Sequence, residues 1–161
     1  VYGGFRTSLR FYGVDFSIGF TYQLGGQVLD QGYMFYMNSP AGTSTGNNYH
    51  HDLLNSWTPE NSGSNIPRFA YNDSNQAAVS DRFLTSASYL NIQNITLGYT
   101  LPKRITRKFL VENLRIYLAC DNVWYWSKRQ GLDPRQAING ITNPYYYAPI
   151  RTFSGGVTVT F

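Results

Sequence analysis

The stretch that decides the fold closes the chain: Thr152-Phe153-Ser154-Gly155-Gly156-Val157-Thr158-Val159-Thr160-Phe161. Side chains of a β-strand alternate between two faces, so every second residue of this stretch shares a face. One face carries only Thr, Ser and Gly, and the other, apolar face carries Phe153, Gly155, Val157, Val159 and Phe161. Such a strand suits a soluble sheet with one buried face. It equally suits a transmembrane β-barrel whose apolar face meets lipid.

Four more segments alternate in the same way and predict strands over residues 4–12, 14–24, 89–101 and 114–126. The second is the clearest, because apolar residues from Val14 to Leu24 alternate without a break over eleven residues. A membrane-crossing strand needs about 9–11 residues, whereas an average soluble strand has about half that length. In the segment 89–101 the pattern slips near Gln93 and Asn94, which predicts a β-bulge.

The connections between these strands alternate between short and long. The short ones are a turn at Gly13 and the segment 103–113, and the long ones, rich in polar residues and glycine, are 25–86 and 127–149. Outer-membrane barrels combine short periplasmic turns with long extracellular loops, whereas long loops are uncommon inside a compact soluble domain. The order therefore predicts two outward-facing loops and a periplasmic C-terminus. The sequence leaves open whether segment 25–86 folds independently.

The composition narrows the class of protein further. Aromatic residues make up 17% and charged residues 14% of the 161 residues, against ~25% charged residues in ordinary globular domains. The formal charge is +4, and the densest basic stretch, Lys103 to Lys108, is too small for a nucleic-acid footprint. Cys120 is the single cysteine, so an internal disulfide is excluded. Strand-like sequence from the first residues, without an initiator Met, predicts a piece of a longer protein.

Three ordered groups of motifs carry a family resemblance. They are SDRFL (80–84) with SYLNIQNITLGYTLP (88–102); NLRIY (113–117) with DNV (121–123) and GLDP (131–134); and PIRTFSGG (149–156) with its continuation to Phe161. The segments WTPEN (57–61) and PR (67–68) add to them. Together they resemble the C-terminal part of SusC/RagA-type TonB-linked outer-membrane proteins. Two departures are Asn91, where a basic residue is expected, and Val123, where Leu is expected.

The resemblance implies an all-β fold: the last five antiparallel strands of a 22-stranded transmembrane barrel, a strand number known for plugged outer-membrane transporters. It implies import of oligosaccharides or peptides across the bacterial outer membrane, energised by the TonB complex. The plug domain is absent from these 161 residues. Expected partners are therefore the remainder of the barrel and its plug, a SusD-like surface lipoprotein, the TonB complex through that plug, and outer-membrane lipid. No nucleic acid, cofactor or metal is expected.

The two faces of the predicted strands have different expected environments. Polar-face residues should face the lumen: Arg6, Arg10, Asp15, Arg115 and Asp121. Apolar-face residues should meet lipid: Val14, Phe16, Ile18, Phe20, Val157, Val159 and Phe161. Trp124 and Trp126 stand at a strand end, where we expect a membrane-interface girdle, with stacking on sugar rings as the alternative. Candidates for substrate or lid contact in the outer loops are Trp57, Tyr145, Tyr146 and Tyr147.

Catalysis is not expected. His50, His51 and Asp52 suggest a metal or acid–base site, but their spacing matches no metal-ligand signature, so we expect a solvated surface. Asp52 and Glu60 could form a carboxylate pair only if the fold brought them together.

Two alternatives to an importer stay open: a soluble β-sandwich module that binds carbohydrate, and a non-transport adhesin barrel. A sandwich should be soluble without detergent, whereas a barrel fragment should aggregate.

Overall fold

A computed structural model of the chain describes residues 1–39, 46–73, 75–76, 78–129, 131–137, 139–143, 145 and 147–161. It comprises two compact units. The sheet unit consists of Val1–Gly26, Ala87–Gln130 and Tyr147–Phe161. The loop unit consists of Gln27–Ser86 and Gly131–Tyr146.

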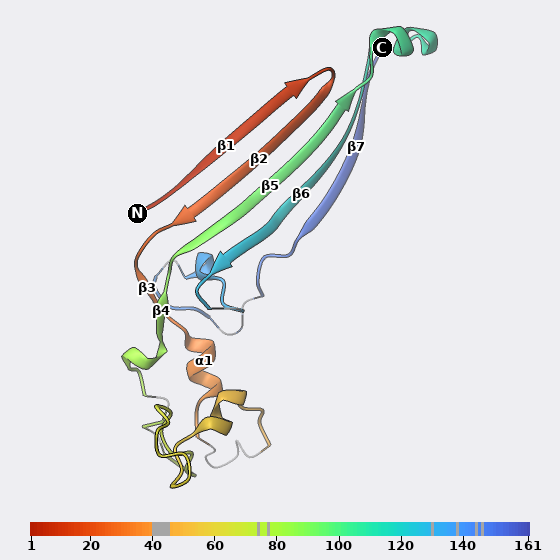
Figure 1. Cartoon of the computed structure of the whole chain (residues 1–161). Coiled ribbons are helices and arrows are strands. Elements are labelled where there is room, and N and C mark those ends of the chain that lie inside the picture. The colour runs from red at the N-terminus through yellow and green to blue at the C-terminus, as the bar shows by residue number, and fades with distance from the viewer. Residues whose placement is uncertain are drawn as a thin grey trace. The chain divides into compact units, whose positions relative to one another are not determined.

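The sheet unit is built on one antiparallel sheet of five strands (Figure 1). The strands are β1 (Tyr2–Phe11), β2 (Val14–Gln23), β5 (Tyr89–Thr100), β6 (Asn113–Ser127) and β7 (Thr152–Thr160). Their order in space, β1-β2-β5-β6-β7, is their order along the chain, so the sheet is a meander in a single layer. The predicted all-β class with antiparallel strands is confirmed.

The register aligns the apolar faces of all five strands. One row across four of them joins Val14, Tyr99, Ile116 and Val157. The predicted irregularity in β5 is confirmed, because Gly19 pairs with Asn94 while Phe20 pairs with Ile92, which leaves Gln93 without an opposite residue in β2. A one-residue slip moves a strand's side chains to the other face. The bulge therefore places Leu90 and Ile92 on the apolar face. Without it, strict alternation would place them on the polar face.

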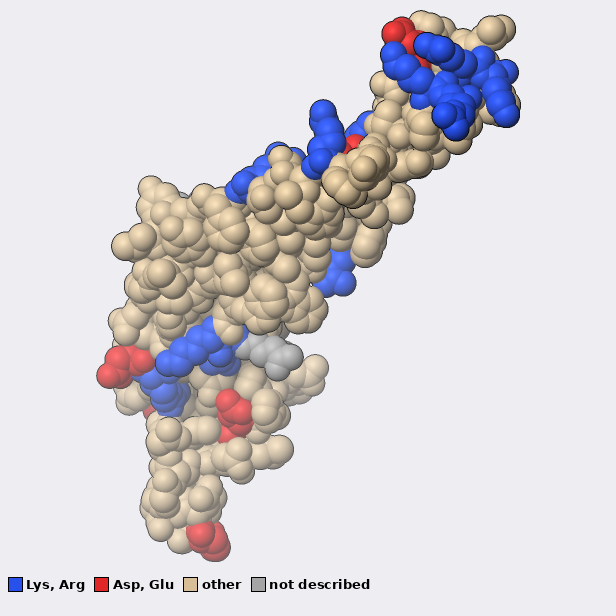
Figure 2. Space-filling model, turned by 45° about the horizontal axis from the view of Figure 1, so that its top comes forward, with Lys and Arg blue, Asp and Glu red and all other residues tan. Residues whose placement is uncertain are grey.

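The connection between β5 and β6 contains α2 (Lys103–Thr106) and a 3-10 turn, η4 (Arg107–Phe109). Leu110 caps the C-terminal end of η4, and its backbone lies in the left-handed region at φ 58°. The backbone N–H of Glu112 donates to the Thr160 carbonyl at 2.8 Å, so the C-terminus lies at this end of the sheet. Lys and Arg gather at this end of the sheet unit (Figure 2), and α2 and η4 supply Lys103, Arg104, Arg107 and Lys108 there.

The loop unit has regular structure of its own. It contains β3 (Gln27–Leu29) paired with β4 (Leu84–Ser86), the helix α1 (Gln31–Tyr36), and the 3-10 turns η2 (His51–Asn55), η3 (Asp81–Phe83) and η5 (Pro134–Gln136). Asp30 caps α1 by accepting a hydrogen bond from the Tyr33 N–H at 2.9 Å. None of the helices among the described residues has the length and apolar character needed to cross a bilayer.

The core of the loop unit draws on both of its segments. Buried apolar side chains come from Val28, Met37, Phe83 and Leu132. The backbone joins them too, since the Thr142 N–H donates to the Leu29 carbonyl at 3.0 Å and the Gln31 N–H donates to Thr142 Oγ1 at 3.0 Å. The two segments predicted as separate outer loops therefore form one folded body.

Candidate functional site

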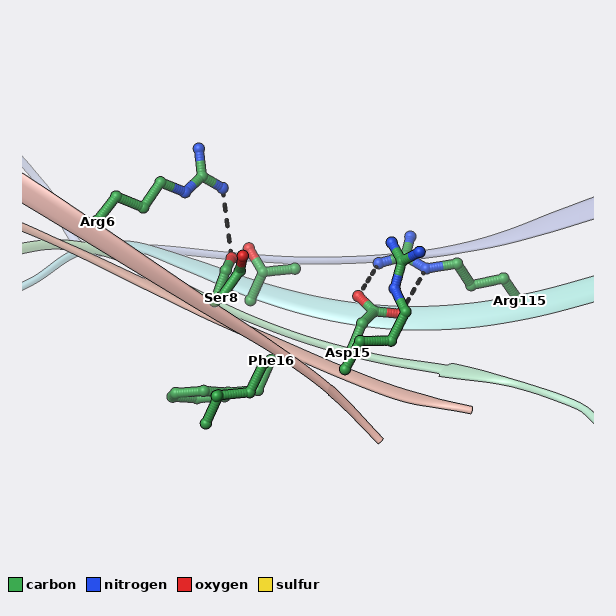
Figure 3. Close-up of a pocket in the computed structure, with 9 residues that line it drawn as sticks. Arg6, Ser8, Asp15, Phe16 and Arg115 are labelled. Carbon is green, nitrogen blue, oxygen red and sulfur yellow. Dashed lines mark hydrogen bonds and ion pairs between the residues drawn. The ribbon is translucent and has the colours of Figure 1, made fainter. Parts of the chain in front are cut away.

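The sheet has one apolar and one polar face, and among the described residues of the sheet unit no second layer of strands covers the apolar face. Among the described residues, the only apolar side chain of this unit that is classed as buried is Ala87. Leu118 is 65% exposed and Val157 61% exposed, although both lie mid-strand. Figure 3 shows Phe16 on the opposite side of the strands from Arg6, Asp15 and Arg115. The sheet unit is thus a wall that leaves its apolar surface uncovered.

An ion pair crosses the polar face from β2 to β6 (Figure 3). Arg115 Nε donates to Asp15 Oδ1 at 2.9 Å, and Arg115 Nη2 donates to the other carboxylate oxygen, so the pair is bidentate. The two residues are separated by a whole strand, β5, and the side chains meet above Gly98. Bidentate geometry fixes both side chains in one orientation. The pair therefore ties three strands together on this face.

Glycine on the polar face provides the room that these side chains need. A Cβ at Gly98 would lie 2.5 Å from both Asp15 Oδ1 and Arg115 Nη2. A Cβ at Gly156 would lie 2.7 Å from the Tyr117 ring, which covers that position. The Arg115 guanidinium in turn lies 5.2 Å from the centre of the Tyr117 ring. The polar side chains thus lie flat along the sheet instead of standing upright.

Further cations surround this pair. Arg10 stands opposite Asp15 in the register, and Arg6 Nη2 donates to Ser17 Oγ at 3.3 Å. A shallow depression on the polar face is lined by Arg6, Arg10, Asp15, Ser17 and Arg115 among others. The depression contains three guanidinium groups and one carboxylate, so it carries an excess of positive charge. Asp121, by its register with Asn94 and Thr152, lies on the same face farther along β6.

Adding a methyl group at Gly98 is expected to break the Asp15–Arg115 pair. Gly98→Ala should lower the free energy of unfolding of the intact protein by about 1–3 kcal/mol, the usual cost of overpacking. In a background that carries Asp15→Ala and Arg115→Ala, the same substitution should cost little, because the clashing atoms are gone. Urea unfolding in detergent would measure both effects. Equal costs in the two backgrounds would contradict this account.

Aromatic residues mark both ends of the apolar face. At one end, Trp124 and Trp126 point to the apolar side, as their pairing with Ile92 and Leu90 requires, and both are exposed. Tyr22 also pairs with Leu90 and lies at the same end. At the opposite end Phe11 and Tyr99 point to the apolar side, and both are exposed. Tyr12, which follows β1, and Phe161, which follows β7, are exposed at this end too. Between Val14 and Tyr22, strand β2 rises by about 27 Å at ~3.4 Å per residue.

The loop unit exposes aromatic side chains on its surface. Trp57 is partly exposed and its backbone N–H donates to the Ile66 carbonyl at 2.9 Å, while Tyr145 is 76% exposed. Tyr147 is 95% exposed and belongs to the sheet unit, and Tyr146 lies outside the described residues. Sequence reasoning missed Phe69 and Tyr49, whose rings meet edge to face at 5.5 Å. The only sequence signal for these two residues was the recurrence of aromatic side chains in an otherwise polar segment.

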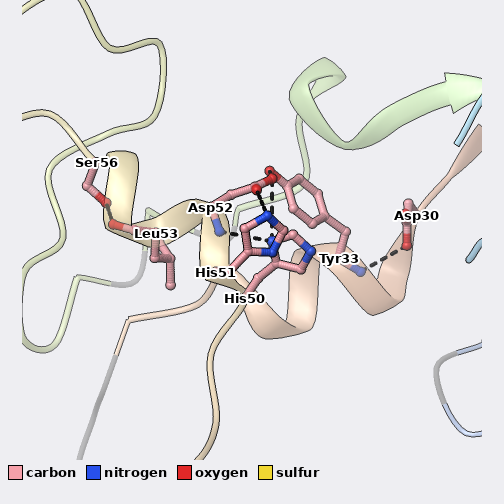
Figure 4. A network of polar contacts seen from close by, with 7 residues as sticks. All are labelled: Asp30, Tyr33, His50, His51, Asp52, Leu53 and Ser56. Atoms are coloured by element: carbon pink, nitrogen blue, oxygen red, sulfur yellow. Dashed lines mark hydrogen bonds and ion pairs between the residues drawn. The ribbon is translucent and has the colours of Figure 1, made fainter. Parts of the chain in front are cut away.

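The third group of predicted residues lies at the start of η2 (Figure 4). His51 Nε2 is 3.0 Å from Asp52 Oδ1, and His50 Nδ1 is 3.4 Å from Asp52 Oδ2. Tyr33, from α1, donates its hydroxyl proton to Asp52 Oδ2 at 2.8 Å. Glu60 is exposed, and no contact joins it to Asp52 in the described structure. The fold thus gathers the two histidines and Asp52, and does not produce the carboxylate pair.

A single-layer antiparallel sheet with an uncovered apolar face, aromatic ends and a polar reverse face is typical of the wall of a transmembrane β-barrel. No family model matches the chain. Two curated relatives match 98% of it: TonB-dependent receptor P3 of Formosa agariphila at 26% identity, and TonB-dependent receptor SusC of Bacteroides thetaiotaomicron at 28% identity. The chain spans only 16% and 15% of their lengths.

Solved structures give the same result. The structure of the RagAB peptide transporter matches 99% of this chain with a TM-score of 0.82 at 25% sequence identity, and the chain covers 17% of that structure. The RagAB peptide importer in its open-open state matches with a TM-score of 0.80, also at 25% identity. These comparisons confirm the resemblance to SusC/RagA-type TonB-linked outer-membrane proteins that the motifs predicted.

Proposed function

We propose that this chain is the C-terminal wall and part of the outer surface of a TonB-energised importer of oligosaccharides or peptides. The observation that carries the proposal is the uncovered apolar face of the sheet, bounded at both ends by aromatic side chains. The height of an outer-membrane barrel's apolar band is about 25 Å. At the ~35–45° tilt of barrel strands, the stretch of β2 from Val14 to Tyr22 spans about 19–22 Å, which is most of that height. In this arrangement Trp124 and Trp126 belong to the outer aromatic girdle.

The names of the relatives support the importer. The curated relatives are named as receptors, and the matched structure is named as a peptide transporter, so none of these names points to an enzyme. In the complete barrel, of 22 strands by the family resemblance, the polar face carrying Arg6, Arg10 and Arg115 would line the lumen and face the plug. The C-terminus and the basic α2–η4 turn would then lie on the periplasmic side. A SusD-like lipoprotein would cover the loop unit from outside.

The exposed aromatic side chains of the loop unit are the proposed contacts for substrate or lid. Rings with large flat faces pack on sugars and on peptide side chains with little loss of conformational entropy. Trp57 and Tyr145 project from one folded unit and so would present a surface of fixed shape. Tyr146 and Tyr147 continue the same run of sequence.

Truncating one of these rings should weaken uptake. Trp57→Ala in the intact protein should raise the substrate concentration for half-maximal uptake by about tenfold, since losing an aromatic anchor typically costs more than ~1 kcal/mol. Glu60→Ala, an exposed neighbour, should leave it unchanged. Uptake of labelled oligosaccharides and peptides into cells with and without TonB would measure the effect. Uptake that is indifferent to TonB would contradict the importer.

The soluble-module alternative has a separate test. A β-sandwich needs a second sheet over the apolar face, and the described residues of the sheet unit form a single layer. Expression of residues 1–161 without detergent should therefore give aggregate. A monodisperse, cooperatively melting monomer would overturn the proposed function and favour the carbohydrate-binding module.

A further inference from the structure

We propose that His50, His51 and Asp52 form a binding site for one divalent transition-metal ion of the Zn²⁺ class. Their three ligand atoms all lie within 4.8 Å of one another. The two histidines are the only ones in the 161 residues, and the fold places them side by side with ring centres 4.5 Å apart. The site lies wholly within the loop unit.

The distances suit a metal with few ligands. Zn²⁺ binds histidine nitrogen and carboxylate oxygen at about 2.0–2.2 Å, and tetrahedral ligands at that radius stand roughly 3.4 Å apart. The two nitrogen–oxygen distances in the cluster are 3.0 Å and 3.4 Å. The three ligand atoms lie within 4.8 Å of one another, so an ion between the imidazoles and the carboxylate requires side-chain rotations that bring these atoms closer together. The His51 side chain is 79% exposed, which leaves room for water to complete the coordination.

The chemistry of the donors selects the metal. Two imidazole nitrogens with one carboxylate suit Zn²⁺, Ni²⁺ and Cu²⁺, whereas Ca²⁺ and Mg²⁺ prefer sites built from oxygen. The Asp52 N–H donates to His50 Nδ1 at 3.2 Å, so this nitrogen acts as a hydrogen-bond acceptor and points toward the cluster. An unprotonated nitrogen is the form that binds a metal. Binding replaces this long hydrogen bond and the contacts of the two imidazoles with the Asp52 carboxylate.

A fourth residue holds the carboxylate in place. The Tyr33 hydroxyl donates to Asp52 Oδ2 at 2.8 Å, and the Tyr33 ring meets the His50 ring edge to face at 4.8 Å. Hydrogen bonds from such outer residues orient metal ligands and raise affinity. Tyr33 comes from α1 and the ligands from the start of η2, so two elements of the loop unit build the site. This contact is what distinguishes the cluster from three adjacent residues on a solvated loop.

Isothermal titration of the intact protein in detergent, purified without a polyhistidine tag, tests the site with Zn²⁺ as the probe. The wild type should bind one ion that His51→Ala releases or weakens at least about tenfold. Because that side chain is exposed, its loss should not disturb folding. Tyr33→Phe should weaken binding about tenfold as well. Glu60→Gln, a carboxylate outside the cluster, should bind as the wild type does, and Mg²⁺ should not compete.

Electron paramagnetic resonance of bound Cu²⁺ gives a second readout. The wild type should show coupling to two imidazole nitrogens, and His51→Ala to one. Equal Zn²⁺ affinity of wild type and His51→Ala, no Zn²⁺ binding at all, or Cu²⁺ without nitrogen coupling would overturn the site. Neither measurement depends on transport, so failure here leaves the importer untouched, and loss of TonB-dependent uptake would leave the metal site untouched.

Discussion

Ile95→Arg is expected to prevent the intact protein from assembling in the outer membrane, whereas Thr96→Arg should be tolerated. The two residues are neighbours in β5 and point to opposite faces. Ile95 pairs with Ile18 and Cys120 at the middle of the apolar face, and Thr96 pairs with Ser17 and Ala119 on the polar face. An arginine at the bilayer midplane costs a barrel about 2–4 kcal/mol, whereas lumen positions accept charge.

Heat-modifiability on gels and outer-membrane fractionation would measure assembly of both variants. The two substitutions add the same side chain to the same strand, so propensity and size are matched and only the face differs. Equal assembly of Ile95→Arg and Thr96→Arg would contradict the assignment of the apolar face to lipid. Failure of Thr96→Arg alone would reverse the two faces.

Phe83→Ala should unfold the loop unit while leaving the barrel wall intact. Phe83 is 2% exposed, and its ring lies 5.9 Å from that of Tyr33. Its backbone carbonyl also accepts a hydrogen bond from the Asp30 N–H at 2.9 Å, next to the cap of α1. Removing a buried phenylalanine costs about 3–5 kcal/mol. Among the described residues of the loop unit only Val28, Met37 and Leu132 join Phe83 as buried apolar core side chains, so the unit should not tolerate that loss.

Protease treatment of whole cells would report the result, because the loop unit is proposed to face outward. Phe83→Ala should be cleaved rapidly between residues 27 and 86, with the barrel still heat-modifiable. Leu54→Ala, at an exposed position of η2, should resist cleavage as the wild type does. Resistance of Phe83→Ala would mean that the loop unit does not depend on this core.

The sheet was largely predictable because alternation is a local signal. Each of the five strands could be found from its own residues, and even the bulge at Gln93 showed as a change of phase. The ordered motifs predicted the family resemblance, which the relatives and the RagAB structures confirm. The assignment of the two faces to lipid and lumen stays a prediction.

The loop unit was not predictable in the same way. Its core joins Val28 and Met37 to Phe83 and Leu132, residues too far apart in the sequence to produce any period. The Asp15–Arg115 pair was missed for a related reason. Both residues were expected on the polar face, but their meeting depends on the register of three strands and on the absence of a side chain at Gly98. His50, His51 and Asp52 were noticed in the sequence but expected to be solvated surface, because the residue that holds Asp52, Tyr33, comes from another element.

The bond between Gln31 and Thr142 joins residues 111 positions apart. Contacts of such long range form late, because closing a large loop is entropically unfavourable and slow. Until segment 131–146 docks, Leu29 lacks its backbone partners Gly140 and Thr142, and the incompletely folded loop unit should expose apolar surface to chaperones and proteases. The loop unit should accordingly mature last, and it should be most vulnerable during biogenesis before Thr142 docks.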